Sequence, residues 1–341
     1  METILSNLKA KWEALKAENP KLRIRDAAKQ LEVSEAELLN TGIGQGVNRL
    51  NDDFQGLLKE TEGLGKVMAL TRNDHCVHER KGIYKKVGFN GHVGLVVTPD
   101  IDLRLFMSHW HFGFAVNEDE RLSLQFFDSD GTAVHKIYLT EHSDRLAYNQ
   151  LVDKYRAQEQ ATALKTQPLP VPATDIADED ADLAGFHQDW IALKDTHDFH
   201  SMVKKHRLSR SQAIRLAPEG YTVRLELETL KDLLKAASDS QTEIMVFTGS
   251  AGCIQIHTGQ INRLVETGPW FNVLDPMFNM HLRMDGIAAI WLVKKPTVDG
   301  LVHSIEVYNA EGNTIVQFFG KRKPGIPESE AWRTLLSAIP A

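Results

Sequence analysis

The chain has 341 residues, a length that favours two domains over one. Hydrophobic residues make up 42% and charged residues 25%, as in an ordinary globular protein with enough apolar material for a core in each half. The net charge of −7 disfavours a protein that works through non-specific phosphate contacts, because such proteins usually carry a basic total. The total charge does not exclude a local basic patch.

The sequence predicts a protein of the reducing cytoplasm. Residues 1–20 carry charges throughout and no apolar core, so we expect no signal peptide. No stretch approaches the roughly 18 apolar residues that a membrane-spanning helix needs, so we expect no membrane insertion. Cys76 and Cys253 are far apart and outside any CxxC pair, which argues against a disulfide framework.

Residues 23–39, near the N-terminus, resemble a helix-turn-helix. Ala27 and Ala28 supply small residues at the right positions, and Ser34 is suited to cap the second helix. The alternative is a plain helical hairpin packed on a sheet. The acidic total and the lack of a basic recognition helix favour the hairpin, so we do not expect nucleic-acid binding.

The segment 66–82 is predicted to form a strand, a polar turn and a second strand. It contains the sequence HCVH, which could chelate a metal ion. Strand alternation places His75 and Val77 on one face and Cys76 and His78 on the other. This alternation disfavours a closed zinc site.

A second apolar strand is predicted at the start of the segment 102–116, DLRLFMSHWHFGFAV. Alternation places Leu103 and Leu105 on one face, and Arg104 with Phe106 on the other. An arginine among aromatic residues could lie over a planar ligand or donate hydrogen bonds to a bound oxygen species. The alternative is an exposed strand arginine without a ligand.

The two halves of the chain repeat one pattern after about 180 residues, which is too long for a solenoid repeat. Residues 122–141 and 302–322 both read as a strand, an acid-Gly turn and a strand. The strand pair 66–82 matches 243–259, and the preceding helices match as well. Between the halves, residues 157–185 are rich in Pro, Ala, Thr and acid, which is typical of an exposed linker.

These observations predict an internally duplicated domain. The repeats are 1–156 and 186–341, joined by the linker 157–185. Each half places helices before a run of strands, so the fold class is α+β with a large antiparallel sheet in each half. A duplicated fold offers a ligand site where its halves meet.

The segment 189–205 carries the main candidate ligands. Asp195 or Thr196 could cap a helix that begins there. His197 and His200, three residues apart, would then lie on one side of that helix, and His206 follows. A neutral imidazole is a good ligand for heme iron. The alternative is that these are surface histidines.

Basic and aromatic residues of the second half could complete such a site. Arg and Lys suit carboxylates such as heme propionates, and aromatic rings could stack on a porphyrin. The alternatives are a solvated rim for the basic residues and a core position for the aromatic ones. The basic residues are Arg207, Arg210, Arg215, Lys294, Lys295, Lys321, Arg322 and Lys323, and the aromatic ones are Phe247, Trp270, Phe271, Phe318 and Phe319.

Taken together, these segments resemble a known family, the cytoplasmic hemin-binding proteins of bacterial heme uptake (the HemS, ChuS, HmuS and PhuS group), also called hemin-degrading factors. The resemblance covers nearly the whole chain. It rests on NPKLRIRDAAKQLEVSEAELL, TRNDHCVHERKG, DLRLFMSHW, DTHDFHSMVKK, IMVFTGSAGCIQIHTG, KKPTVDG and QFFGKR, in this order.

The resemblance implies two large sheets packed together and heme bound in a cleft near the C-terminal half. His197 stands where the family has its iron ligand, and Arg104 stands at the distal arginine position. Phe319 stands where other members have tyrosine, so a hydroxyl is missing here. Further positions that line the heme or its propionates are Arg210, Lys295, Gln317 and Arg322. We also expect Phe247 at the heme.

Two histidines carry additional expectations from the resemblance. Family members have phenylalanine or a second histidine at the position of His200. Because His200 follows His197 by one helical turn, it could take over the iron when heme is handed on. His78 matches a proposed secondary heme contact, although a lone strand histidine is also compatible with a purely structural role.

The family resemblance leaves two functions open. In the first, the protein degrades heme oxidatively and releases iron, with Arg104 on the distal side and electrons from a reductase or a soluble reductant. In the second, it carries heme from an inner-membrane transporter to a separate heme oxygenase. A heme-responsive nucleic-acid-binding regulator is a third reading, which the acidic charge disfavours.

Overall fold

The computed structural model describes residues 2–160, 162–170, 175–323 and 325–339. The chain divides into two compact units. The N-terminal unit comprises Met1–Arg72, Glu79–Pro170 and Ser250–Gln255, and the C-terminal unit comprises Asn73–His78, Val171–Gly249 and Ile256–Ala341. None of the helices within the described residues is long and apolar enough to cross a membrane.

The N-terminal half of the chain begins with helices and continues with strands. Its helices are α1 (Glu2–Glu18), α2 (Ile24–Gln30), α3 (Glu35–Asn40), α4 (Phe54–Glu60), η1 (Thr61–Leu64), η2 (Met107–His109) and α5 (Arg145–Tyr155). Its strands are β1 (Val47–Arg49), β2 (Gly65–Arg72), β3 (Cys76–Gly82), β4 (Gly88–Asn90), β5 (Val93–Val97), β6 (Asp102–Phe106), β7 (Phe112–Glu118), β8 (Arg121–Phe127) and β9 (Ala133–Ser143).

The C-terminal half of the chain repeats this order. Its helices are η3 (Asp178–Asp180), α6 (Leu183–Ile191), α7 (Asp198–Lys205), α8 (Arg210–Arg215), α9 (Leu227–Asp239), η4 (Met284–Gly286) and α10 (Glu330–Ser337). Its strands are β10 (Thr222–Leu225), β11 (Ile244–Gly249), β12 (Cys253–Gly259), β13 (Leu264–Thr267), β14 (Trp270–Leu274), β15 (Phe278–Arg283), β16 (Ala289–Thr297), β17 (Gly300–Tyr308) and β18 (Thr314–Gly320). Helix α6 thus begins inside the stretch predicted as linker.

The described strands form two nine-stranded sheets with matching orders. The first order is β1-β7-β8-β9-β2-β3-β15-β14-β13, and the second is β10-β16-β17-β18-β11-β12-β6-β5-β4. Position by position, the second order repeats the first. The two hairpins predicted from acid-Gly turns are β8–β9 and β17–β18, and Gly131 and Gly312 at their turns have φ of 82° and 78°. The predicted α+β duplication is therefore confirmed.

Helices α2 and α3 form the hairpin expected from residues 23–39. Ser34 caps α3, because its hydroxyl accepts a hydrogen bond from the backbone N–H of Glu37 while the Glu37 carboxylate accepts one from the backbone N–H of Ser34. Ala27 and Ala28 pack with Trp12 of α1 in one small apolar cluster. Helix α1 therefore helps to cover the apolar side of this helix pair.

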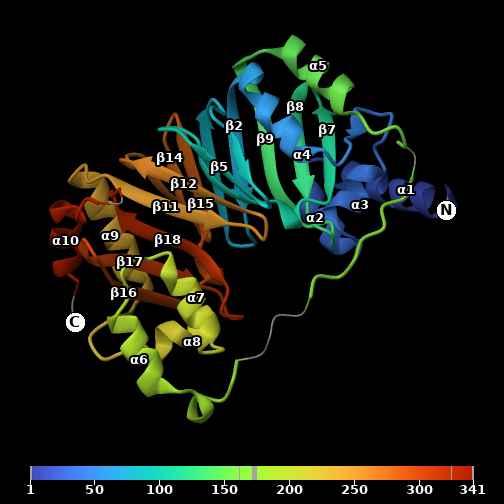
Figure 1. Cartoon of the computed structure of the whole chain (residues 1–341). Coiled ribbons are helices and arrows are strands. Elements are labelled where there is room, and N and C mark those ends of the chain that lie inside the picture. Colours follow the sequence, from blue (N-terminus) through green and yellow to red (C-terminus); the bar gives the residue numbers. More distant parts are fainter. Residues whose placement is uncertain (1, 161, 171–174, 324, 340–341) are drawn as a thin grey trace. The chain divides into compact units, whose positions relative to one another are not determined.

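In the C-terminal unit, helices pack on both faces of strands β16 and β17 (Figure 1). On one face, Ile290 and Ile305 share a core with the helices α9 and α10. On the other face, Val293 and Tyr308 pack against α6, α7 and α8 through Trp190, Phe199 and their neighbours. This packing fixes helix α7 against the sheet and positions the candidate site.

Candidate functional site

His197 lies at the N-cap of helix α7, one residue before the first helical residue. Its side chain is 80% exposed, and its Nδ1 lies 2.7 Å from Oδ1 of Asp195. The same oxygen accepts a hydrogen bond of 2.9 Å from the backbone N–H of His197. With Nδ1 donating to a carboxylate, the lone pair of Nε2 points away, which is the arrangement found behind imidazole ligands of metals.

The loop before α7 also sets the charge of Asp195. The backbone N–H of His197 lowers the pKa of this carboxyl below its ordinary value, and the His197 ring and the positive charge of Arg322 act in the same direction. Asp195 therefore stays ionised at neutral pH and keeps His197 Nδ1 as the donor. The sequence prediction had assigned Asp195 or Thr196 as the helix cap; the structure places His197 there instead.

His200 and His206 have different surroundings. Like His197, His200 is exposed near the start of α7, whereas Phe199, Met202 and Val203 of this helix are buried. His206 is turned to α6, where its Nε2 lies 2.7 Å from the carboxylate of Asp189. His200 is thus accessible to a ligand, and His206 helps to hold α7 on α6.

Beneath α7, three charged groups and a tyrosine meet in a network that is buried except for Arg210, whose side chain is 34% exposed. Glu306 on β17 is fully buried and accepts hydrogen bonds from Arg210 at 2.9–3.0 Å, from Lys295, and from the hydroxyl of Tyr308 at 2.6 Å. Two cations and one carboxylate leave one net positive charge. Arg210 and Lys295 both lie over the ring of Phe199, at 5.0 and 4.4 Å from its centroid.

Burial and charge oppose each other in this network. Burial alone would raise the pKa of Glu306, but Arg210 and Lys295 outweigh it and hold the pKa well below the usual range. Burial also lowers the pKa of Lys295 to about 8, against the opposing effect of Glu306. The network therefore ties helix α8 to strands β16 and β17 through an ionised carboxylate.

Strands β11 and β18 carry the aromatic candidates beside this network. Phe247 pairs with Gln317 across the two strands, and Gln317 pairs with Glu306 on β17. The rings of Phe247 and Phe319 lie 4.9 Å apart, and both residues are partly exposed. Opposite residues in an antiparallel pair share a face, so these side chains lie on the same face as the buried network.

Two buried donors on this side have no hydrogen-bond partner within the described residues: Nε2 of Gln317 and Nε of Arg322. A buried polar group without a partner costs about 1–3 kcal/mol, so such atoms usually mark a place where a ligand or water binds. Arg322 also interacts electrostatically with Asp195, which holds His197. Arg322 thus acts electrostatically on the same carboxylate that orients the ring of His197.

Arg104 and His78, the other two candidates from the family resemblance, differ in their exposure. Arg104 on β6 pairs with Asp102, and its side chain is 32% exposed. It lies opposite Leu95 of β5, on a face where Val93, Leu95 and Val97 are exposed. The ring of His78 is fully buried, 4.8 Å from that of Phe278, so contact with a ligand would require β3 to move.

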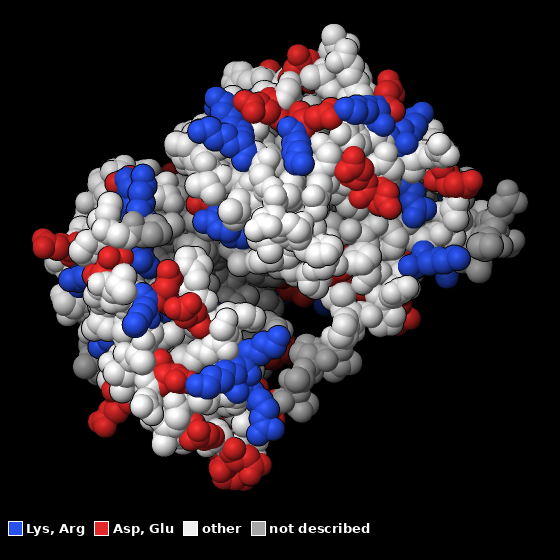
Figure 2. All heavy atoms as spheres, in the orientation of Figure 1, with Lys and Arg blue, Asp and Glu red and all other residues white. Residues whose placement is uncertain are grey.

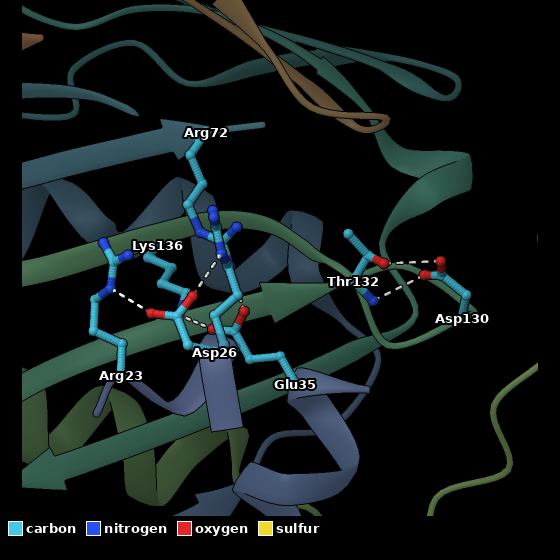
Figure 3. Close-up of polar contacts among 8 residues, drawn as sticks. Arg23, Asp26, Glu35, Arg72, Asp130, Thr132 and Lys136 are labelled. Carbon is cyan, nitrogen blue, oxygen red and sulfur yellow. Dashed lines mark hydrogen bonds and ion pairs between the residues drawn. The ribbon is translucent and has the colours of Figure 1, made fainter. Parts of the chain in front are cut away.

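The equivalent position in the N-terminal unit has different chemistry. The strand registers place Leu70, Lys136 and Tyr138 where the C-terminal unit has Phe247, Gln317 and Phe319. Figure 3 shows the carboxylate of Glu35 held by Lys136 and Arg72.

Burial would raise the pKa of Glu35, but Lys136 and Arg72 lower it below its ordinary value. At the start of α2, where the C-terminal unit has His197, stands Arg23 in an ion pair with Asp26 (Figure 3). This unit therefore presents no exposed histidine at the corresponding helix start.

Sequence reasoning missed Glu306, Tyr308 and the role of Asp195 as the acceptor of His197. Alternation on residues 302–308 places Ser304, Glu306 and Tyr308 on one strand face, which is equally typical of a solvent face. The pattern does not reveal that helices α6, α7 and α8 cover this face.

The family model of the Haemin-degrading HemS.ChuX domain matches residues 32–155 and again residues 207–339. The chain belongs to this family. It is 38% identical over 329 residues to the hemin transport proteins HmuS of Yersinia pestis and HemS of Yersinia enterocolitica, covering 95% of this chain and 94% of each relative. The resemblance inferred from the sequence is thereby confirmed.

Solved structures agree with this assignment. Holo-PhuS, a heme-binding protein from Pseudomonas aeruginosa, superposes with a TM-score of 0.97 at 48% identity, over 99% of both chains. The heme degrading enzyme ChuS from Escherichia coli O157:H7 superposes with a TM-score of 0.90 at 34% identity, over 98% of this chain and 99% of ChuS.

Proposed function

We propose that this protein binds heme as its cargo in the cytoplasm and serves bacterial heme uptake, with His197 of the C-terminal unit as the iron ligand. The observation that carries the proposal is the exposed ring of His197, whose Nδ1 is bound to Asp195 so that Nε2 is left for a metal. Its support from outside the structure is the similarity to the heme-binding protein PhuS.

The residues around His197 fit the other parts of a heme molecule. The partly exposed rings of Phe247 and Phe319 suit the apolar faces of a porphyrin. The unpartnered donors of Gln317 and Arg322 suit its propionates, and the network of Arg210, Lys295 and Glu306 adds one net positive charge nearby.

Arg210 and Lys295 contribute differently from what the sequence had suggested. Both cations are already paired with Glu306, so they do not have the full capacity of free cations for a propionate. Their proposed role is to hold helix α8 in place and to supply the positive field. The direct donors among the proposed residues are then Gln317 and Arg322, whose Nε2 and Nε atoms have no hydrogen-bond partner within the described residues.

Arg104 is a further proposed heme contact. Its support is the face on which it lies, because Val93, Leu95 and Val97 are exposed beside it and suit a flat apolar ligand. A guanidinium on such a face can donate hydrogen bonds to an oxygen-containing ligand. The buried ring of His78 gives no comparable support for a secondary contact.

Two roles for the bound heme compete. A carrier would accept heme from an inner-membrane transporter and pass it to a separate heme oxygenase. The exposed His197 and His200 at the start of one helix favour this role, because a second imidazole allows an exchange of ligands. A degrading enzyme would oxidise the porphyrin with O₂ and electrons from a reductase, and the similarity to ChuS supports that role.

Nucleic-acid binding has less support. The chain has a net charge of −7, and acidic and basic side chains are interspersed on the face drawn in Figure 2. An extended basic surface is the usual electrostatic requirement for duplex binding.

Reduction of the one-to-one heme complex in air, with catalase present, distinguishes the two roles. Catalase removes free peroxide, which would otherwise bleach heme without help from the protein. Decay of the Soret band to a defined ring-opened product, lost in His197→Ala, would establish degradation. Heme that persists until an acceptor protein is added would establish a carrier.

A further inference from the structure

A second pair of histidines, which is not among the residues proposed to contact heme, lies in the N-terminal unit. His109 ends the short helix η2, and His111 directly precedes strand β7. Trp110 between them is buried, and its indole N–H donates a hydrogen bond of 3.0 Å to the carbonyl of Gly252. With Trp110 anchored inward, the side chains on either side of it are 40% and 45% exposed.

Both histidines lie beside one buried carboxylate, that of Asp128. Nδ1 of His109 lies 2.8 Å from Oδ2 of Asp128, and Nδ1 of His111 lies 3.4 Å from Oδ1. Asp128 is only 1% exposed, and its Oδ1 also accepts a hydrogen bond of 2.7 Å from the backbone N–H of Ser129. The carboxylate is therefore fixed, and it orients the ring of His109 through a hydrogen bond while the ring of His111 lies beside it.

This arrangement decides which ring nitrogens are free. A carboxylate accepts hydrogen bonds, so Nδ1 of His109 is its protonated nitrogen and its Nε2 keeps a lone pair. Nδ1 of His111 faces the same negative charge at 3.4 Å, which favours the same tautomer. A histidine that binds a metal commonly donates its other N–H to a carboxylate in this way, which orients the ring and raises its basicity. An ordinary surface histidine such as His142, beside the exposed Glu141, lacks a buried acceptor.

We propose that His109 and His111 bind a divalent transition metal ion of the class that prefers imidazole, such as Cu²⁺, Zn²⁺ or Ni²⁺, through their Nε2 atoms. Asp128 is the positioning residue. Within the described part of the chain, no group of three or more His, Cys, Asp or Glu residues is disposed to hold a metal. In the proposed site the two imidazoles are the protein ligands, and water takes the remaining coordination positions.

The test uses the full-length, heme-free His197→Ala/His200→Ala protein, so that the proposed heme site does not bind the probe. Cu²⁺ is titrated by calorimetry, and the complex is examined by electron paramagnetic resonance. We expect binding with superhyperfine splitting from two equatorial nitrogens. His109→Ala and His111→Ala should each weaken binding at least about tenfold, and the double variant should lose this signal.

Two further variants separate ligation from general surface effects. Asp128→Asn should weaken Cu²⁺ binding about tenfold to a hundredfold, because it removes the carboxylate that accepts from His109 and lies beside His111. His142→Ala should bind Cu²⁺ like the parent. Heme binding by His109→Ala and His111→Ala, with His197 and His200 intact, should equal wild type and shows that both variants are folded. Unchanged Cu²⁺ binding in the His109→Ala/His111→Ala variant, or a parent without a two-nitrogen signal, would overturn the proposal.

Discussion

The Nδ1 atom of His197 lies 2.7 Å from Oδ1 of Asp195, and the backbone N–H of His197 donates to the same oxygen. One carboxylate thus fixes both the backbone at the start of helix α7 and the orientation of the imidazole. The proposed heme ligand is held by its own loop, two residues upstream, rather than by a distant part of the fold.

This relationship predicts that Asp195→Asn weakens heme binding about tenfold or more, because the amide supports the ring less strongly than a carboxylate does. Heme titration followed by the Soret band measures the affinity. Asp198→Asn is the matched control, because Asp198 is an exposed carboxylate in the first turn of the same helix. Equal affinities for the two variants would contradict the role given to Asp195.

A second prediction concerns the buried carboxylate of the charge network. Glu306→Gln leaves Arg210 and Lys295 without a counter-charge and should lower the free energy of unfolding by about 3–5 kcal/mol. Urea denaturation followed by circular dichroism measures this loss. Glu311→Gln, in the exposed turn between β17 and β18, should change the free energy of unfolding by less than about 0.5 kcal/mol. A loss below about 1 kcal/mol for Glu306→Gln would show that the network contributes little.

The same carboxylate predicts a dependence of stability on pH. The pKa of Glu306 is lowered in the folded protein, so its contribution to stability is present above the unfolded value of about 4.3 and is lost as pH falls toward the folded pKa. The free energy of unfolding should therefore fall more steeply below about pH 4.3 for wild type than for Glu306→Gln. Urea titrations at several acidic pH values test this difference, and parallel pH profiles would refute it.

Gln317 offers a prediction with opposite effects on stability and binding. Its buried Nε2 has no hydrogen-bond partner within the described residues, so Gln317→Leu should leave the heme-free protein as stable as wild type, or more stable by about 1–3 kcal/mol. The same substitution should weaken heme binding, because the donor for the ligand is gone. Chemical denaturation and heme titration of one protein sample measure both effects. A variant that loses stability and keeps its heme affinity would mean that Gln317 is structural.

The duplication could be predicted from the sequence because the patterns that indicate its turns and strands are local. An acid-Gly pair between alternating apolar residues specifies a tight turn on its own, as at Asp130-Gly131 and Glu311-Gly312. Alternation also separated the two faces of β6 correctly, since Leu103 and Leu105 are fully buried whereas Arg104 is partly exposed. Such features depend on neighbours a few residues away.

The network around Glu306 could not be predicted in the same way. Its members Arg210 and Glu306 are 96 residues apart, and only the packing of α8 on β17 brings them together. The strand pattern indicates that Glu306 and Tyr308 share a face, but it does not indicate whether water or helices cover that face. The capping position of His197 was equally hidden, because Asp195, Thr196 and His197 are all compatible with a helix start.

The most direct test of the central claim is the optical and electron paramagnetic resonance spectrum of the ferric heme complex of wild type, His197→Ala and His200→Ala. We predict that His197→Ala changes the axial ligation and lowers heme affinity, and that added imidazole restores the wild-type spectrum. A His197→Ala complex with the spectrum and affinity of wild type would contradict the assignment of His197. If the His200→Ala complex also matched wild type, the proposed exchange of the iron ligand between His197 and His200 would be contradicted as well.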